Sequence, residues 1–217
     1  MKYRLAIFDL DGTILDTLED LADSLNYALS KAGYPTRRIE EVRAFVGNGL
    51  LSLVRLALPE GSSEEVAQSV LQELKVYYKV HCADKTKPYP EIMELLYALK
   101  DAGLKLAVVS NKADYAVQIL CEQYFEKIFD LTVGEREGVA KKPAPDAVFA
   151  VLDELEIEKN KAVYIGDSEV DILTGRNAEM DCILVDWGFR DASVLREQGA
   201  DVIVSSVAAL EKELLRG

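Results

Sequence analysis

The second half of the chain alternates short apolar runs with segments of helical periodicity. The apolar runs, together with one near the N-terminus, cover residues 5–8, 104–109, 128–133, 162–165, 182–185 and 202–204. The helical segments include 115–123, 146–155 and 91–100, the last of which Pro90 and Gly103 mark at its start and end. Strands that alternate with helices in this way lie parallel and are joined by helical crossovers. The predicted fold is therefore α/β, with a Rossmann-like, doubly wound parallel sheet as its core.

A long stretch after the first predicted strand, residues 16–85, shows helical periodicity and no convincing strand. Ser62 followed by Glu65 has the spacing of a capping box at the start of one of its helices. A crossover between parallel strands needs only one helix, so several helices indicate an insertion. We expect an α/β catalytic core over residues 1–15 and 86–217 and an all-helical cap over 16–85. Its helices are predicted over 18–29, 50–58 and 63–81.

The charge balance limits the partners of this protein. Of the 217 residues 49% are apolar, which is typical of a globular chain. The chain has 38 acidic and 25 basic residues, a formal net charge of -13, which argues against nucleic acid and anionic membrane surfaces as partners. Any phosphate site must therefore be locally positive.

The cysteines and the hydropathy pattern point to a reducing compartment. Cys82, Cys121 and Cys182 are far apart and show no C-x-x-C spacing, so neither a disulfide framework nor a zinc site is predicted. No apolar stretch has the length of a membrane span, and the first predicted strand follows the N-terminus without a signal-like segment. We expect a cytoplasmic protein, either a monomer or a homodimer.

Two aspartates, Asp9 and Asp11, follow the apolar run 5–8 directly. Side chains alternate along an extended chain, so both carboxylates point the same way at the end of a strand, where ligands bind in open α/β sheets. Gly12 then allows a sharp turn and a close approach to a ligand. A divalent cation, Mg²⁺ best of all, would relieve the repulsion between the two carboxylates. Asp–Gly is also a common turn dipeptide, so a capped turn without a cation is an equally good interpretation of this pair alone.

Three further motifs follow apolar runs or lead into helices. Ser110 and Asn111 come after 104–109, where the hydroxyl would bind a phosphate oxygen or cap a helix. Lys142 precedes Pro143 in a stiff loop, either as a fixed positive charge or as a solvated lysine. After Gly166, Asp167 and Asp171 lie four residues apart, which suits a shared cation or the N-terminal end of a helix.

Taken together and in this order, the four motifs resemble those of the haloacid dehalogenase superfamily of phosphotransferases. The resemblance covers the whole chain, because the helical insert is similar to the C1 cap of that superfamily. It implies that Asp9 attacks phosphorus to form an aspartyl-phosphate, with Asp11 as general acid and then base. Mg²⁺ would be held by Asp9, the main-chain carbonyl of Asp11 and Asp167. Ser110 and Lys142 would hold phosphoryl oxygens, and Asp171 would orient the metal's waters or Lys142.

Two shorter segments, 45–49 and 187–190, are similar to those of phosphoglycolate phosphatases. In the first, Gly47, Asn48 and Gly49 would offer main-chain donors to the polar head of a substrate, although a plain helix-to-helix turn uses the same residues. The resemblance thus implies a Mg²⁺-dependent phosphatase of a small phosphorylated metabolite, with phosphoglycolate favoured and Gly12 and Asn111 also contacting substrate. Pyrophosphate, a sugar phosphate or a nucleotide as substrate, a β-phosphoglucomutase-like reaction and a non-catalytic scaffold are the alternatives.

Overall fold

The computed structural model describes residues 2–216, which form two compact units. The α/β unit comprises the residues up to Leu15 and those from Pro88 onward, and the helical unit comprises Asp16–Lys87. The chain passes between the units at two short strands, β2 (Leu15–Asp16) and β3 (Lys87–Pro88), which pair with each other. The assignment of these units as catalytic core and cap stays a prediction.

The α/β unit is built on a six-stranded sheet in the order β5-β4-β1-β6-β7-β8. All the pairings between its neighbouring strands are parallel, which confirms the predicted fold class. The chain first builds the sheet from β1 toward β5 and then from β6 toward β8, so β1 lies where the direction of winding reverses. The strands are β1 (Leu5–Phe8), β4 (Lys105–Ala113), β5 (Leu131–Glu135), β6 (Ala162–Gly166), β7 (Asp181–Val185) and β8 (Ile203–Val204).

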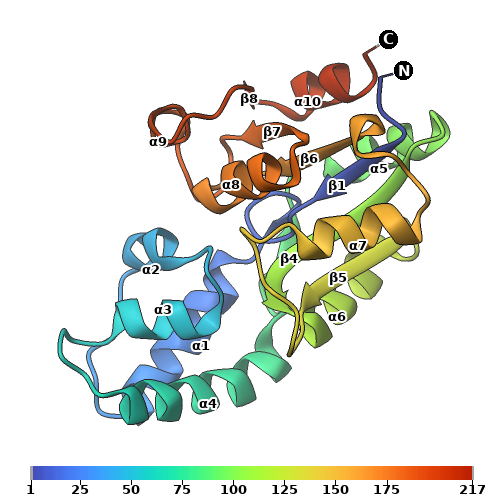
Figure 1. Ribbon diagram of the computed structural model, residues 1–217. Coiled ribbons are helices and arrows are strands. Elements are labelled where there is room, and N and C mark those ends of the chain that lie inside the picture. Colours follow the sequence, from blue (N-terminus) through green and yellow to red (C-terminus); the bar gives the residue numbers. More distant parts are fainter. Residues whose placement is uncertain (1, 217) are drawn as a thin grey trace. The chain divides into compact units, whose positions relative to one another are not determined.

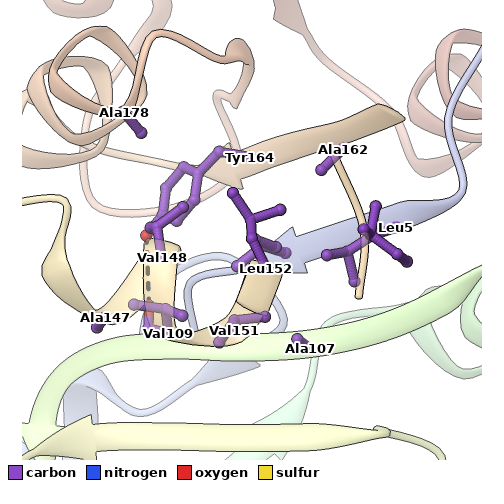
Figure 2. Packing of buried hydrophobic residues seen from close by; sticks show 12 residues of the cluster. Leu5, Ala107, Val109, Ala147, Val148, Val151, Leu152, Ala162, Tyr164 and Ala178 are labelled. Atoms are coloured by element: carbon purple, nitrogen blue, oxygen red, sulfur yellow. Dashed lines mark hydrogen bonds between the residues drawn. The ribbon is translucent and has the colours of Figure 1, made fainter. Parts of the chain in front are cut away.

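Helices cover both faces of this sheet (Figure 1). They are α5 (Ile92–Asp101), α6 (Asp114–Phe125), α7 (Asp146–Glu154), α8 (Glu169–Ala178), α9 (Ala192–Glu197) and α10 (Val207–Leu214). The helix α7 packs on alternate residues of the central strands, as the pleat of a sheet requires. In Figure 2, Tyr164 of β6 lies among these side chains, near Val148 of α7 and with its hydroxyl directed toward Val109 of β4.

Several predicted boundaries are wrong in ways that have physical causes. The strand β4 continues to Ala113 instead of ending at residue 109, and β5 begins at Leu131 instead of 128. Pro90 lies outside the helix it was expected to open, because Glu91 is the N-cap and α5 begins at Ile92. Gly103 does follow the end of α5, with φ of +87°.

The helical unit contains four helices, α1 (Leu18–Lys31), α2 (Ile39–Phe45), α3 (Leu50–Ala57) and α4 (Glu64–His81). The sequence did not predict α2. The cap of α4 was placed one residue early, because Ser63 accepts the hydrogen bond from the main-chain N–H of Val66. The hydroxyl of Ser62 donates instead to the carbonyl of Pro59. Across residues 2–216, no helix combines the length and the apolar character that a bilayer crossing requires.

Candidate active site

Most of the buried polar residues of the α/β unit gather near the carboxyl ends of β1, β4 and β6. Asp9 follows β1, Ser110 lies near the end of β4, and Asp167 follows β6. These strands are neighbours in the sheet and include the point where its winding reverses, which is the usual place for a ligand site in such folds. Motifs that lie more than 50 residues apart in sequence therefore meet at one edge.

The turn after β1 brings Asp9 and Asp167 together. Gly12 has φ of +84°, and a Cβ atom on it would lie 2.4 Å from Oδ2 of Asp167. A side chain at this position would thus displace the carboxylate, which explains the glycine better than conformational freedom alone. Thr13 donates to Oδ1 of Asp167 over 3.2 Å, and the main-chain N–H of Gly12 donates to Leu15.

A buried ion-pair network connects Lys142 to two carboxylates. The Lys142 Nζ atom lies 2.8 Å from Oδ1 of Asp171 and 3.0 Å from Oδ1 of Asp9. It also donates to the hydroxyl of Tyr164 over 2.9 Å. The other oxygen of Asp171 accepts hydrogen bonds from the hydroxyl and main-chain N–H of Ser168 and from the main-chain N–H of Asp167. Asp171 is therefore saturated, and it fixes Lys142 and the turn after β6.

Burial and charge separate the pKa values of the three aspartates. Burial raises the pKa of Asp9 to about 6; Lys142 opposes this shift, and Asp171 and Asp11 add to it. Burial, with repulsion from Asp171 and Asp9, raises the pKa of Asp167 well above its usual range. Burial would also raise the pKa of Asp171, but Lys142 and the hydrogen bonds from Ser168 and Tyr164 lower it. The site therefore holds negative charge that Lys142 does not fully compensate.

The end of β4 positions a lysine that the sequence analysis did not single out. The pairing of β4 with β5 shifts register between Val109 and Ala113, an irregularity of the kind that redirects side chains beside active sites. Within it, Lys112 is buried and its Nζ atom lies 2.8 Å from Oδ1 of Asp11. A sequence signal was present, since Lys112 lies two residues after Ser110 and shares its side of an extended chain.

The predicted partners Ser110 and Asn111 are both buried at this point. The main-chain N–H of Lys112 donates to Oγ of Ser110, and Nδ2 of Asn111 donates to the carbonyl of Lys142. Asn111 therefore ties the loop of Lys142 to the end of β4. Contact of either side chain with a substrate stays a prediction.

The loop after β7 also contacts Asp167, in addition to the turn after β1. The main-chain N–H of Phe189 donates to Oδ2 of Asp167 over 2.7 Å, and Trp187 Nε1 donates to the carbonyl of Thr13. A Cβ atom on Gly188 would lie 2.3 Å from the carbonyl oxygen of Gly12 and 2.5 Å from Asp167. Sequence reasoning noted this segment only as a similarity and missed that it packs on a site carboxylate.

The acidic cluster has the chemistry of a divalent-cation site. Carboxylate oxygens of Asp9, Asp167 and Asp171 all lie within 4.8 Å of one another and are buried. One oxygen of Asp171 accepts hydrogen bonds from Lys142 and Tyr164 and the other accepts from Ser168 and the main-chain N–H of Asp167, whereas Asp167 accepts one from Thr13 and one from Phe189. Asp9 and Asp167 are therefore the members with the greater capacity for a metal. Their raised pKa values express the repulsion that a cation would relieve. The residues present therefore fit a hard, oxygen-preferring ion such as Mg²⁺.

Gly47, Asn48 and Gly49 lie in the helical unit, in the turn between α2 and α3. Gly49 is the N-cap of α3 with φ of +81°, so the turn itself requires a glycine there. Their contact with a substrate stays a prediction.

Comparison with known proteins supports the same chemistry. Residues 6–185 match the haloacid dehalogenase-like hydrolase family. This chain belongs to the haloacid dehalogenase-like hydrolase family. A phosphoglycolate phosphatase of Psychrobacter arcticus is 34% identical over 100% of this chain and 97% of its own length, and one of Aquifex aeolicus is 36% identical over 86% of each chain. A crystal structure of a candidate phosphoglycolate phosphatase from Lactobacillus delbrueckii subsp. bulgaricus is 42% identical, with a TM-score of 0.95 and full coverage of both chains.

Membership in the haloacid dehalogenase-like hydrolase family explains why the buried charges concentrate at one sheet edge. Phosphatases of this family generally use Mg²⁺, and the cluster of Asp9, Asp167 and Asp171 supplies suitable oxygen ligands. The family match spans β1 through β7 and thus the motifs that contain Asp9, Ser110, Lys142 and Asp167, while the loop of Phe189 follows directly after it.

Proposed function

We propose that this hydrolase is a Mg²⁺-dependent phosphatase that cleaves small phosphomonoesters through an aspartyl-phosphate on Asp9. The observation that carries the proposal is the buried arrangement of Asp9, Asp167 and Asp171 with Lys142 bridging Asp9 and Asp171. A nucleophilic carboxylate, a cation site and a fixed ammonium ion are the parts that phosphoryl transfer requires.

Asp9 is the nucleophile in this proposal. Its Oδ1 atom accepts hydrogen bonds from Lys142 and from the main-chain N–H of Leu10, at 3.0 and 2.7 Å, which fixes the carboxylate in one orientation. Such fixation lets Oδ2 approach phosphorus in line without reorganisation. Asp9, Asp167 and the main-chain carbonyl of Asp11 would hold Mg²⁺, which would supply positive charge to the phosphoryl oxygens and so allow the anionic Asp9 to approach phosphorus.

Asp11 moves the proton. Its side chain is 14% exposed and lies beside Asp9 on the same turn, so it can reach the oxygen of a leaving alcohol and later a water. Protonated Asp11 gives its proton to the leaving oxygen as the ester bond breaks, and the resulting carboxylate then deprotonates the water that hydrolyses the aspartyl-phosphate. Ser110 and Lys142 hold the phosphoryl oxygens that face away from Asp11.

Phosphoglycolate is the substrate we favour. The curated relatives from Psychrobacter arcticus and Aquifex aeolicus carry that name, and residues 187–190 resemble the corresponding segment of such enzymes. We assign the helical unit the role of a cap that excludes water during transfer. We place the enzyme in the cytoplasm with a small phosphorylated metabolite as its partner.

The test is phosphate release from phosphoglycolate, pyrophosphate, a hexose 1-phosphate and a nucleotide, each with Mg²⁺ and with a chelator. Release that requires Mg²⁺ and is fastest with phosphoglycolate is the expected result. Release from another ester would retain the mechanism and change the substrate. Conversion of the hexose phosphate to an isomer without free phosphate would overturn the hydrolase assignment.

A further inference from the structure

Two lysines are buried in the α/β unit, and the mechanism uses only one of them. Lys142 is shared between Asp9 and Asp171 on the side of the nucleophile. Lys112, with a side chain that is 4% exposed, contacts Asp11 instead. Burying an ammonium ion costs free energy unless it is paired, so a second buried lysine in the same site requires its own explanation.

The position of Lys112 relative to Asp11 places it on the side of the leaving group. In the proposed mechanism, a carboxyl oxygen of Asp11 lies within hydrogen-bonding distance of the leaving oxygen. The Nζ atom of Lys112 lies 2.8 Å from Oδ1 of Asp11. Two successive hydrogen bonds bring Lys112 within about 6 Å of the leaving oxygen. An anionic group one carbon beyond that oxygen would therefore lie within reach of the ammonium ion.

The net negative charge of the chain favours a cation at the position where a second anionic group of the substrate binds. At a formal charge of -13, the protein as a whole repels a substrate that carries a phosphate and a second anion. In the proposed mechanism the cation site and Lys142 serve the phosphoryl group, next to the three buried aspartates Asp9, Asp167 and Asp171. Lys112 is the buried cation beside Asp11, the residue that contacts the leaving oxygen in the proposed mechanism. An ammonium ion has three N–H donors, so Lys112 can bind the second anion while it keeps its ion pair with Asp11.

We infer that Lys112 is a specificity-determining residue, which binds a carboxylate on the leaving alcohol and so selects phosphomonoesters of small 2-hydroxy acids. The inference rests on the proposed function, because it takes Asp11 as the general acid. Lys112 lies within the register shift at the end of β4, an irregularity of the kind that redirects side chains, and its main-chain N–H donates to Oγ of Ser110.

The competing role for Lys112 is positioning alone. An ammonium ion that only orients Asp11 would affect proton delivery to every leaving group, whatever its charge. A substrate-binding role affects only esters that carry the carboxylate. The two roles therefore differ in how a substitution changes the ratio of kcat/KM values between a charged and an uncharged ester.

The experiment compares phosphoglycolate with ethyl phosphate, in which a methyl group replaces the carboxylate. Wild-type enzyme and Lys112→Met are assayed with Mg²⁺, and Lys161→Met, which removes an exposed lysine of the same unit, is the control for net charge. We expect Lys112→Met to lower kcat/KM for phosphoglycolate by about 100-fold and for ethyl phosphate by less than about 10-fold. We expect Lys161→Met to leave the ratio within about twofold of wild type.

Each outcome decides between the roles. A similar loss for both esters would assign Lys112 to positioning and overturn the inference, as would a wild-type enzyme that hydrolyses both esters equally well. Absence of phosphate release from either ester by the folded wild-type enzyme would instead remove the proposed function. Lys112→Gln, which retains a hydrogen-bond donor for Asp11, repeats the comparison if circular dichroism shows that Lys112→Met does not fold.

Discussion

Both units bury a carboxylate, but they surround it differently. In the helical unit, Asp20 is 2% exposed and accepts hydrogen bonds from the main-chain N–H groups of Lys85 and Thr86 and from the Thr86 hydroxyl. In the α/β unit, Asp9 and Asp167 face each other and Asp171, and burial raises the pKa of both.

The difference separates a structural carboxylate from a reactive one. The donors around Asp20 belong to the segment where the chain leaves α4, so this carboxylate fixes a connection within the helical unit. The carboxylates around Asp9 destabilise one another, and neighbours such as Lys142 compensate only part of that repulsion. A cluster of carboxylates that repel one another is typical of a functional site, whereas a carboxylate whose hydrogen bonds are all made is typical of a structural role.

The largest expected effect follows from Asp9→Asn, which removes the proposed nucleophile. We expect phosphate release to fall at least about 10⁴-fold, because an amide does not form the acyl-phosphate. Urea unfolding, followed by the fluorescence of the single tryptophan, Trp187, should show stability equal to or above that of wild type without metal. Asp153→Asn on the exposed face of α7 is the control, and a comparable activity loss there would contradict the assignment.

For Asp20→Ala we expect a loss of stability, in contrast to the loss of activity expected for Asp9→Asn. The substitution leaves the donors of Lys85 and Thr86 without their acceptor, so we expect the free energy of unfolding to fall by about 3 kcal/mol. Asp23→Ala in the same helix removes an exposed ion pair with Lys85 and should cost less than about 1 kcal/mol. Urea titrations followed by circular dichroism measure both; equal costs would remove the distinction between the two carboxylates.

Burial of Asp9 beside other carboxylates also predicts a pH dependence of stability. The pKa of Asp9 in the folded, metal-free protein is about 6, above its ordinary value of 3.8, so the folded state binds this proton more tightly. The stabilisation is complete below the ordinary value and is lost as pH rises through about 6, by an amount on the order of 3 kcal/mol. Urea titrations of wild type and Asp9→Asn from pH 4 to 8 isolate this contribution. Parallel curves would show that Asp9 has no raised pKa.

A smaller effect is expected from Gly188→Ala. The added Cβ would lie 2.5 Å from Oδ2 of Asp167 and would displace this proposed Mg²⁺ ligand, so we expect Mg²⁺ affinity to fall about 10-fold. Calorimetric Mg²⁺ titration gives the affinity without turnover. Gly103 has a positive φ of +87° and open space around an added Cβ atom, so Gly103→Ala should change stability and leave Mg²⁺ affinity as it was.

The parts of this structure that the sequence predicted well are those set by local pattern. The alternation of strand and helix located β1 at residues 5–8, and motif order predicted one site from Asp9, Ser110, Lys142 and Asp167. The structure brings Asp9, Lys142 and Asp167 together, and their roles in catalysis stay predictions. Lys112 was missed because β4 was ended at residue 109, while the structure continues it through a register shift. The hydrogen bond from the main-chain N–H of Phe189 to Asp167 joins residues 22 positions apart. It depends on how β6 and β7 pair, which no local sequence pattern predicts.

Trapping of the intermediate tests the central claim most directly. Enzyme in turnover with phosphoglycolate and Mg²⁺ is quenched with borohydride, which reduces an aspartyl-phosphate to homoserine, and the peptide that contains Asp9 is examined by mass spectrometry. We predict reduction at Asp9 that requires both substrate and Mg²⁺ and that disappears in Asp9→Asn. Sustained phosphate release with Asp9 unmodified, or with reduction at another carboxylate, would contradict Asp9 as the nucleophile.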